Sequence, residues 1–123
     1  MNLLLDTCTL LWWVNGSPVS AEATEAIADP DNVVWVSAAS AWEISIKQAI
    51  GKLTVRGDFD AVVDEDFEHL PISLAHARLA GQLPRHHRDP FDRMLVAQAQ
   101  LHDFLLVTRD AKIREYEAAV LVS

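Results

Sequence analysis

Cysteine is almost absent from this chain, since Cys8 is the only one among 123 residues. An internal disulfide is therefore excluded, and so is a C-x-x-C zinc or redox motif. We accordingly expect a protein of the reducing cytoplasm. A long hydrophobic run is also missing, because Asp6 interrupts the apolar N-terminal stretch. The basic segment with which a signal peptide begins is absent as well. The sequence predicts neither a signal peptide nor a membrane span.

Positive charge is scarce as well. Ten lysines and arginines stand against eighteen aspartates and glutamates, which gives a formal net charge of −8. Broad adhesion to nucleic acid or anionic lipid is disfavoured, since both need a basic surface. Any contact with a polyanion has to be local, and the basic side chains concentrate in the segment 85–93. This segment holds Arg85, His86, His87, Arg88 and Arg93.

The length and the hydrophobic content fit one domain over residues 1–123. Half of the residues are hydrophobic, which is enough to close one core without disulfides. Short apolar or β-branched runs predict strands at 3–5, 33–36, 69–72, 104–107 and 118–122. Helical patterns fill the stretches between them, around 10–13, over 20–29, from Ser37 or Ser40 to 50, over 58–68 and 74–82, from Pro90 onward and over 110–116. Strands that alternate with helices favour a parallel sheet with helices on both faces.

Four acidic residues stand where predicted strands end or predicted helices begin. Asp6 and Asp110 follow strands, Glu43 lies in the first turns of a helix, and Asp92 opens another. Ligands of parallel α/β sheets bind at the C-terminal edge of the strands, so all four side chains can approach one rim. Asp92 also shares its helical stripe with the apolar residues three, four and seven positions later, which places a carboxylate on an inward-facing row.

Each of these acids, taken alone, also has a purely structural interpretation. Asp6 and Asp110 can be helix N-caps, worth about 1 kcal/mol each. Asp92 can belong to a capping box with the residue that precedes the proline, or complement the helix dipole. Glu43 can pair with Lys47 on a solvated face, which is worth about 0.3 kcal/mol. The sequence leaves these alternatives open.

Taken together, the four acids favour a metal site. Four carboxylates within about 5 Å would repel one another and raise one another's pKa unless a cation lay among them. With oxygen ligands and no thiolate, the preferred ions are Mg²⁺ and Mn²⁺. Such a site suits metal-assisted hydrolysis of a phosphodiester. The predicted ligands and catalytic residues are Asp6, Glu43, Asp92 and Asp110.

Four stretches carry a family resemblance that covers nearly the whole chain. They are LLLDTCTLLWW at 3–13, SAASAWEISIKQAIGKL at 37–53, LPISLAHARLAGQLPRHHRDPFDRMLVAQA at 70–99 and LLVTRDAKI at 105–113. In order and spacing they resemble the PIN-domain nucleases, in particular the VapC-like toxins of bacterial toxin-antitoxin pairs. The resemblance implies a three-layer α/β/α sandwich around a central parallel sheet of about five short strands. It also implies that the four acids form the metal site, with Thr7 and Thr108 as hydroxyl neighbours.

The resemblance further implies an RNA substrate, a cognate antitoxin as inhibitor and a homodimer. The sequence departs from the pattern at Cys8, where many relatives carry a histidine. We interpret this cysteine as a small buried residue, neither a ligand nor a nucleophile.

The segment before Asp92 adds further candidates. His86, His87 and Arg88 can contact phosphates of a substrate or an antitoxin, or they can form an exposed polar loop before a capped helix. Asp89 is predicted to be the N-cap of the helix that begins at Pro90, although a supporting role near the metal is compatible with its position.

Three other functions remain open at this stage. A phosphotransfer domain also clusters acids at strand ends, but it needs a lysine after a late strand, where this chain has Arg109 and Asp110. A noncatalytic binding module would use the acids only as caps. A PIN-fold nuclease that processes RNA outside a toxin pair would keep the metal site. Metal dependence of activity separates the first two from a nuclease.

Overall fold

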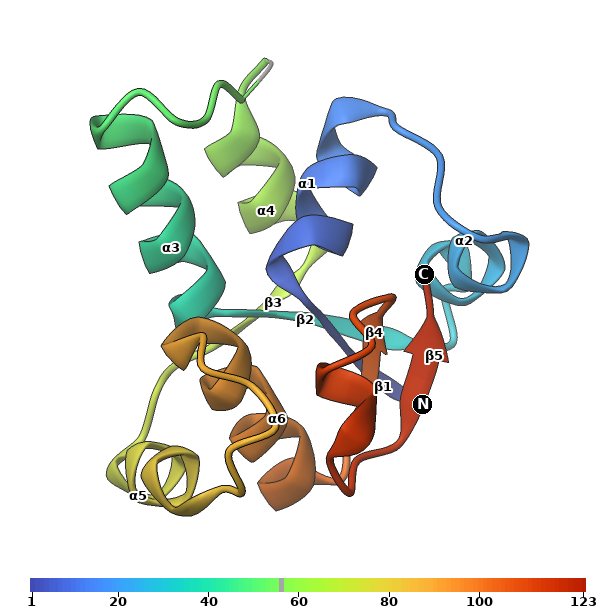
Figure 1. Cartoon of the computed structure of the whole chain (residues 1–123). Coiled ribbons are helices and arrows are strands. Elements are labelled where there is room, and N and C mark those ends of the chain that lie inside the picture. The colour runs from blue at the N-terminus through green and yellow to red at the C-terminus, as the bar shows by residue number, and fades with distance from the viewer. Residues whose placement is uncertain (56) are drawn as a thin grey trace.

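A computed structural model describes residues 1–55 and 57–123 and contains a central five-stranded sheet (Figure 1). Every neighbouring pair of strands is parallel, and the strand order is β3-β2-β1-β4-β5. The strands are β1 (Asn2–Leu5), β2 (Val33–Ser37), β3 (Glu68–Leu70), β4 (Leu105–Thr108) and β5 (Val120–Val122). Because all the described strands point the same way, their C-terminal ends lie along one edge of the sheet.

Helices cover both faces of this sheet (Figure 1). The N-terminal helices lie on one face, namely α1 (Thr7–Asn15), α2 (Ala21–Ala28), α3 (Ala38–Ala49) and α4 (Phe59–Asp66). The other face carries α5 (Leu74–Gln82), α6 (Pro90–His102) and the short 3₁₀ helix η1 (Ile113–Glu115). The expected three-layer α/β/α sandwich with five short parallel strands is therefore confirmed.

The alternation of side chains along β1 divides the core in two. Leu3 and Leu5 pack with the layer that contains α1 and α2, whereas Leu4 packs with α5 and α6. All three side chains are fully buried. A central strand of a parallel sheet is covered on both faces, which explains why this run is apolar without alternation.

Local signals in the sequence set most of the helix starts. Ser20, Ser37, Ser73 and Asp89 each cap a helix through a side-chain oxygen that accepts a backbone N–H. Gly51 follows α3 with a φ of 74°, the left-handed conformation expected of a glycine at a helix C-terminus. Strand limits were predicted less well, and β3 begins one residue before the predicted 69 and ends at Leu70.

Helix α3 exists as predicted, but its buried face is not the apolar stripe that the helical spacing of Trp42, Ile46, Ala49 and Ile50 forms. Trp42 is 61% exposed and Ile50 is 59% exposed, while Glu43 and Ile44 are buried. Glu43 therefore does not lie on a solvated face, which was one of the two positions that the sequence left open. Helix α3 packs on α1 and α6. Its buried residues are Ala39, Ser40, Glu43 and Ile44, so Trp42 and Ile46 face outward.

None of the helices in the described ranges combines the length and the apolar character that crossing a membrane requires.

Candidate metal centre and active site

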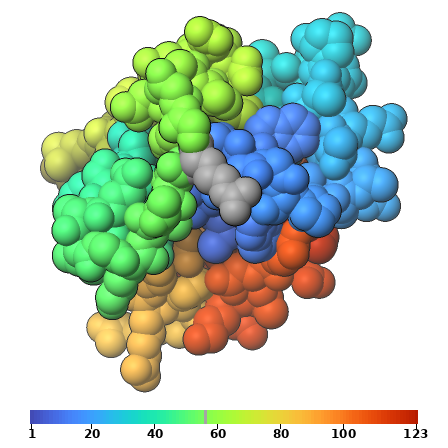
Figure 2. All heavy atoms as spheres, turned by 90° about the horizontal axis from the view of Figure 1, so that it is seen from above, coloured from blue at the N-terminus to red at the C-terminus, as the bar shows by residue number. Residues whose placement is uncertain are grey.

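The four predicted acids come from four elements that end or begin at the same edge of the sheet. Asp6 follows β1, Asp110 follows the neighbouring β4, Glu43 lies on α3, and Asp92 lies in the first turn of α6. Figure 2 looks down on this part of the molecule and shows the α1 segment flanked by α3 and by the C-terminal segments. The fold thus gathers side chains from distant parts of the sequence.

Asp6 is fixed between two elements. Its Oδ1 accepts the backbone N–H of Thr9 at 2.8 Å, so it caps α1, and its Oδ2 accepts the hydroxyl of Thr108 at 2.5 Å. The side chain is buried, and burial raises the pKa of Asp6 although these hydrogen bonds oppose the rise. The N-cap interpretation is correct for Asp6. The hydrogen bond from Thr108 holds its other oxygen beside the end of β4, so capping is compatible with a role as a metal ligand.

Glu43 is a buried carboxylate with one oxygen satisfied. Its Oε2 lies 2.6 Å from Nζ of Lys47, one helical turn later, and this hydrogen bond raises the pKa of Lys47. Within the described part of the chain, its Oε1 is buried and has no hydrogen-bond partner. An unpaired carboxylate oxygen in a buried position is costly. The pairing with Lys47 is confirmed, but it involves Oε2 alone and leaves the buried Oε1 without a partner among the described residues.

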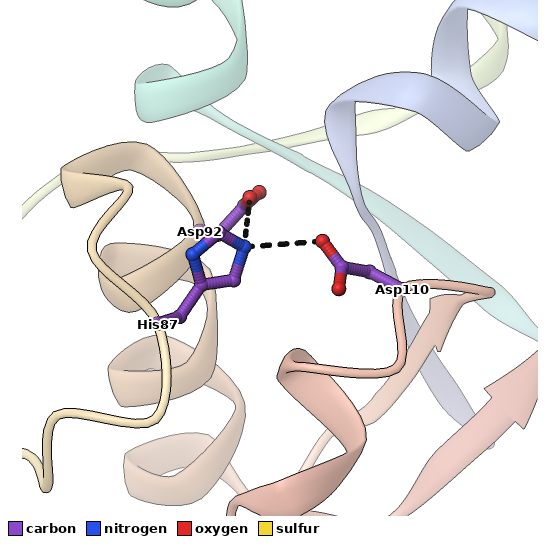
Figure 3. Close-up of side chains that lie close together, drawn as sticks. All are labelled: His87, Asp92 and Asp110. Atoms are coloured by element: carbon purple, nitrogen blue, oxygen red, sulfur yellow. Dashed lines mark hydrogen bonds and ion pairs between the residues drawn. The ribbon is translucent and has the colours of Figure 1, made fainter.

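The tightest cluster joins His87, Asp92 and Asp110 (Figure 3). Nε2 of His87 lies 3.0 Å from Oδ2 of Asp92 and 3.1 Å from Oδ2 of Asp110. One ligand atom from each residue lies within 4.8 Å of the others, a spacing that a metal ion could bridge. Figure 3 shows the imidazole ring between the two carboxylates. Two of the four predicted acids are thus brought together, and a histidine joins them.

The two carboxylates of this cluster have opposite pKa shifts. Burial, followed by the nearby charge of Asp89, raises the pKa of Asp92 to about 7, and the charges of Glu43 and Asp6 act in the same direction. Burial also acts to raise the pKa of Asp110, but hydrogen bonds from the backbone of Lys112 and from His87 lower it overall. Mutual repulsion among the acids is therefore present in the protein without a cation.

For His87 the sequence predicts either a phosphate contact or a place in an exposed loop. Its side chain is only 13% exposed, and it contacts two acids, so the exposed-loop interpretation is wrong for this residue. The segment that carries it is held by Tyr116, whose hydroxyl accepts the N–H of His87 and donates to the carbonyl of Pro84. No local pattern could reveal these contacts, because Tyr116 lies 29 residues away.

Arg93 ties the same segment to the end of α5. Its guanidinium donates to the carbonyls of Ala80 at 2.8 Å, Leu83 at 2.9 Å and Pro84 at 3.0 Å. It also reaches the carbonyl of His87 at 3.4 Å. A cation at the C-terminal end of a helix is stabilised by the unpaired carbonyls and the helix dipole.

We expect Arg93→Lys to destabilise the protein by about 2 kcal/mol, because lysine cannot reproduce the fork of donors that serves several carbonyls. The melting temperature should fall by several degrees. Thermal melting of Arg93→Lys and of Arg78→Lys, an exposed arginine on the same α5, measures the difference. A melting temperature equal to that of Arg78→Lys would contradict this role of Arg93.

The remaining candidates fall into three environments. The Thr7 hydroxyl donates to Ser40 at 2.9 Å, while Thr108 contacts both Asp6 and the N–H of Asp110. Asp89 is the N-cap of α6, as predicted, and its backbone N–H donates to Nδ1 of His87. Thr108 therefore links two of the acids directly.

Arg88 is exposed at the rim of the site. It lines a hollow of about 460 Å³ together with Gly81, Arg85, His87 and Arg93. The hollow is therefore bordered by positive charge next to the acidic cluster.

Cys8 is exposed, so the prediction that it is buried was wrong. It lies in the first turn of α1, beside the acids. Desolvation of the thiol and the charges of Asp6, Asp92 and Glu43 raise its pKa to about 11. The thiol therefore stays protonated near neutral pH, which agrees with the interpretation that it is neither a ligand nor a nucleophile.

Comparison with protein families gives a match to the PIN domain over residues 3–119. The chain belongs to the PIN domain family. PIN domains are nucleases and use divalent metal ions. Membership in this family removes the phosphotransfer domain from consideration. A comparison with curated protein sequences gives no match.

Several solved structures share the fold of this PIN domain. VapBC2 from Rickettsia felis, bound to a DNA fragment from its promoter, superposes with a TM-score of 0.75 at 16% identity, over 99% of this chain and 98% of that chain. DNA-bound VapBC from Salmonella typhimurium gives 0.72 at 17% identity, over 99% and 98%. A toxin-antitoxin complex from Klebsiella pneumoniae gives 0.69 at 23% identity, over 97% and 95%. At these identities the likeness demonstrates a common fold.

The residues of this PIN domain fit a divalent metal ion. The orphaned Oε1 of Glu43 lacks the partner that a buried carboxylate oxygen needs. Asp92 and Asp110 present oxygens close enough to be bridged, and Asp6 and Glu43 lie near enough to raise the pKa of Asp92. All of these donors are oxygens of the kind preferred by Mg²⁺ and Mn²⁺.

Proposed function

We propose that this PIN domain is a metal-dependent endoribonuclease that hydrolyses RNA phosphodiester bonds, and that it is the toxin of a toxin-antitoxin pair. The observation that carries the proposal is the acidic rim, by which we mean the four predicted acids at the C-terminal edge of the sheet. On this rim, the buried Oε1 of Glu43 has no hydrogen-bond partner among the described residues. In our proposal Asp6, Glu43, Asp92 and Asp110 hold Mg²⁺ or Mn²⁺. When bound, the ion would activate a water molecule and stabilise negative charge on the phosphate.

The chain's own residues prepare this site in three ways. Thr108 donates to Asp6 and accepts the N–H of Asp110, so a single hydroxyl sets the distance between two strand ends. Capping by Asp89 fixes the start of α6 and hence the position of Asp92. The buried neighbourhood strengthens the interaction of each carboxylate with a cation.

A chain with a net charge of −8 repels RNA over most of its surface, so it needs a local basic surface to bind RNA phosphates. Arg85 and Arg88 are exposed and line the hollow beside His87. We propose that they contact RNA phosphates next to the cleaved bond.

Replacing Arg88 by glutamine should therefore raise KM for RNA severalfold and leave kcat nearly unchanged. The slope of the logarithm of RNA affinity against the logarithm of salt concentration should also become shallower by about one, the contribution of one phosphate contact. Fluorescence anisotropy with a labelled single-stranded RNA at several salt concentrations measures this, with Arg78→Gln as the matched control. Equal salt slopes for the two variants would contradict the contact.

The proposed partners are a cognate antitoxin and a second copy of the chain. The similar structures from Rickettsia felis, Salmonella typhimurium and Klebsiella pneumoniae are toxin-antitoxin or VapBC assemblies, which supports an antitoxin. Exposed apolar side chains, Trp42 and Ile46 on α3 and Ile50 at its C-terminal end, support coverage of this surface by a protein.

Expression in a bacterial host without the antitoxin tests the toxin role. We expect growth arrest, relief by Asp92→Asn, and relief by co-expression of a short DNA-binding protein encoded beside this reading frame. Metal-dependent RNA cleavage in vitro without growth arrest would favour an RNA-processing PIN nuclease. Absence of both activities would favour a noncatalytic binding module.

A further inference from the structure

The hydrogen bonds of His87 fix where its proton lies. The backbone N–H of Asp89 can only donate, and it points at Nδ1 of His87 at 3.1 Å. Nδ1 must therefore accept, which places the proton of the neutral ring on Nε2. Nε2 is the atom that lies 3.0 Å from Asp92 and 3.1 Å from Asp110 (Figure 3). His87 is thus an N–H donor to the two carboxylates.

This arrangement is the reverse of that found in a metal-bound histidine. A histidine ligand offers an unprotonated nitrogen to the metal and donates its other N–H to a carbonyl or carboxylate. In His87 the nitrogen that faces the acids carries the proton, and the other nitrogen accepts from Asp89. A cation and the Nε2–H group would seek the same oxygen lone pairs of Asp92 and Asp110, and these atoms all lie within 4.8 Å.

We propose that His87 occupies the place of the cation between Asp92 and Asp110 in the metal-free protein, and that its ring leaves this place when the divalent ion binds. The inference rests on the proposed metal site. His87 is then a positioning residue that keeps two repelling carboxylates together and weakens metal binding by competing for them.

The surroundings of His87 allow its ring to move while its backbone stays. Tyr116 accepts the backbone N–H of His87 at 2.9 Å, and Arg93 donates to its carbonyl at 3.4 Å. His87 also lines the hollow of about 460 Å³ together with Arg85 and Arg88. We expect the ring to rotate into this hollow. We therefore expect side-chain rotation rather than displacement of the segment.

The test measures Mn²⁺ affinity by the electron paramagnetic resonance signal of the free ion, in wild type and in three variants. His87→Asn keeps an oxygen near the position of Nδ1, so it can still accept from Asp89, but it cannot reach the acids. We expect it to bind Mn²⁺ about tenfold more tightly, because a hydrogen bond to charged groups no longer competes. His87→Gln, whose amide can still donate near the position of Nε2, should stay close to wild type.

His86→Asn is the matched control. His86 packs edge-on against Tyr116 and lies 3.8 Å from Glu115, away from the acidic cluster, so its loss should leave Mn²⁺ affinity unchanged. Unchanged affinity in His87→Asn would overturn the proposal, and weaker affinity would overturn it by making His87 a ligand. Failure of wild type and all variants to bind Mn²⁺ would instead refute the metal centre itself.

A second measurement needs no substitution at His87. Nitrogen chemical shifts of the imidazole ring report which nitrogen carries the proton, and they can be followed as Mg²⁺ is added to the wild-type protein. We expect Nε2 to remain protonated with Mg²⁺ bound and the signals to shift as the ring leaves the acids. Loss of the Nε2 proton on Mg²⁺ addition would overturn the proposal.

Discussion

Replacement of Asp92 or Asp6 by asparagine is expected to abolish RNA cleavage, with a loss of at least about a hundredfold in kcat, while the fold survives. Each substitution removes a charged oxygen ligand that Mg²⁺ prefers. The fold survives because asparagine caps a helix about as well as aspartate, so Asp6→Asn can still accept the N–H of Thr9. Cleavage of a labelled RNA with Mg²⁺ or Mn²⁺, with circular dichroism as the check on folding, measures both effects.

Two further aspartates make this experiment decisive. Asp58 caps α4 in the same way that Asp6 caps α1, but it is none of the four proposed ligands, so Asp58→Asn should keep full activity. Asp89→Asn should keep most activity, because asparagine can replace the N-cap of α6. Full activity in both Asp6→Asn and Asp92→Asn would refute the metal site. Inactivation by Asp89→Asn as strong as that by Asp92→Asn would show that the wrong aspartate of the pair was assigned as a ligand.

The second large effect is on stability. Mg²⁺ or Mn²⁺ should raise the melting temperature by several degrees, since an ion at a hundred times its dissociation constant stabilises the folded state by about 2.7 kcal/mol. Without the ion, Asp92→Asn should be more stable than wild type at pH 8, and its metal-induced shift should be smaller. The reason is that the carboxylate of Asp92 is buried beside other acids, which raises its pKa to about 7.

The direction of the pH dependence follows from this raised pKa. In the unfolded chain Asp92 loses its proton near 3.8, and in the folded metal-free protein near 7. Between these values the folded state holds more protons, so the contribution of Asp92 to stability is lost as pH rises from about 4 to 7. A difference of about three in pKa corresponds to a cost of up to about 4 kcal/mol above pH 7. The advantage of Asp92→Asn should therefore be large at pH 8 and small at pH 4.5.

Melting curves with EDTA or with Mg²⁺, at constant ionic strength, measure these changes without confusing ion binding with screening. The same curves for Asp58→Asn provide the control for the loss of one negative charge at a helix N-cap that is not a proposed ligand. A metal-free Asp92→Asn that is less stable than wild type, with an undiminished shift on adding Mg²⁺, would make Asp92 a structural residue and move any metal elsewhere.

The sequence by itself determined the architecture of this protein and the elements that carry the acids. Buried strands such as β1 and capped helices such as α6 are set by local patterns, namely apolar runs, side chains that accept backbone N–H groups, and proline at the first helical turn. Since the strands of a parallel sheet end at one edge, the convergence of Asp6 and Asp110 followed from their positions after β1 and β4. The inward row led by Asp92 was also correct, because Leu95 and Val96 behind it are fully buried.

The tertiary structure alone decided which side chains meet. His87 could be exposed or paired on sequence grounds, and its contact with Asp110 joins residues 23 positions apart through the packing of α6 beside β4. For Glu43 the sequence left open a place at the sheet edge and a solvated pairing with Lys47. Helix α3 buries this carboxylate and exposes Trp42, because the side of α3 that carries Glu43 and Ile44 is the covered one. Helical periodicity states which residues share a face, but which face is covered depends on neighbours that are distant in the chain.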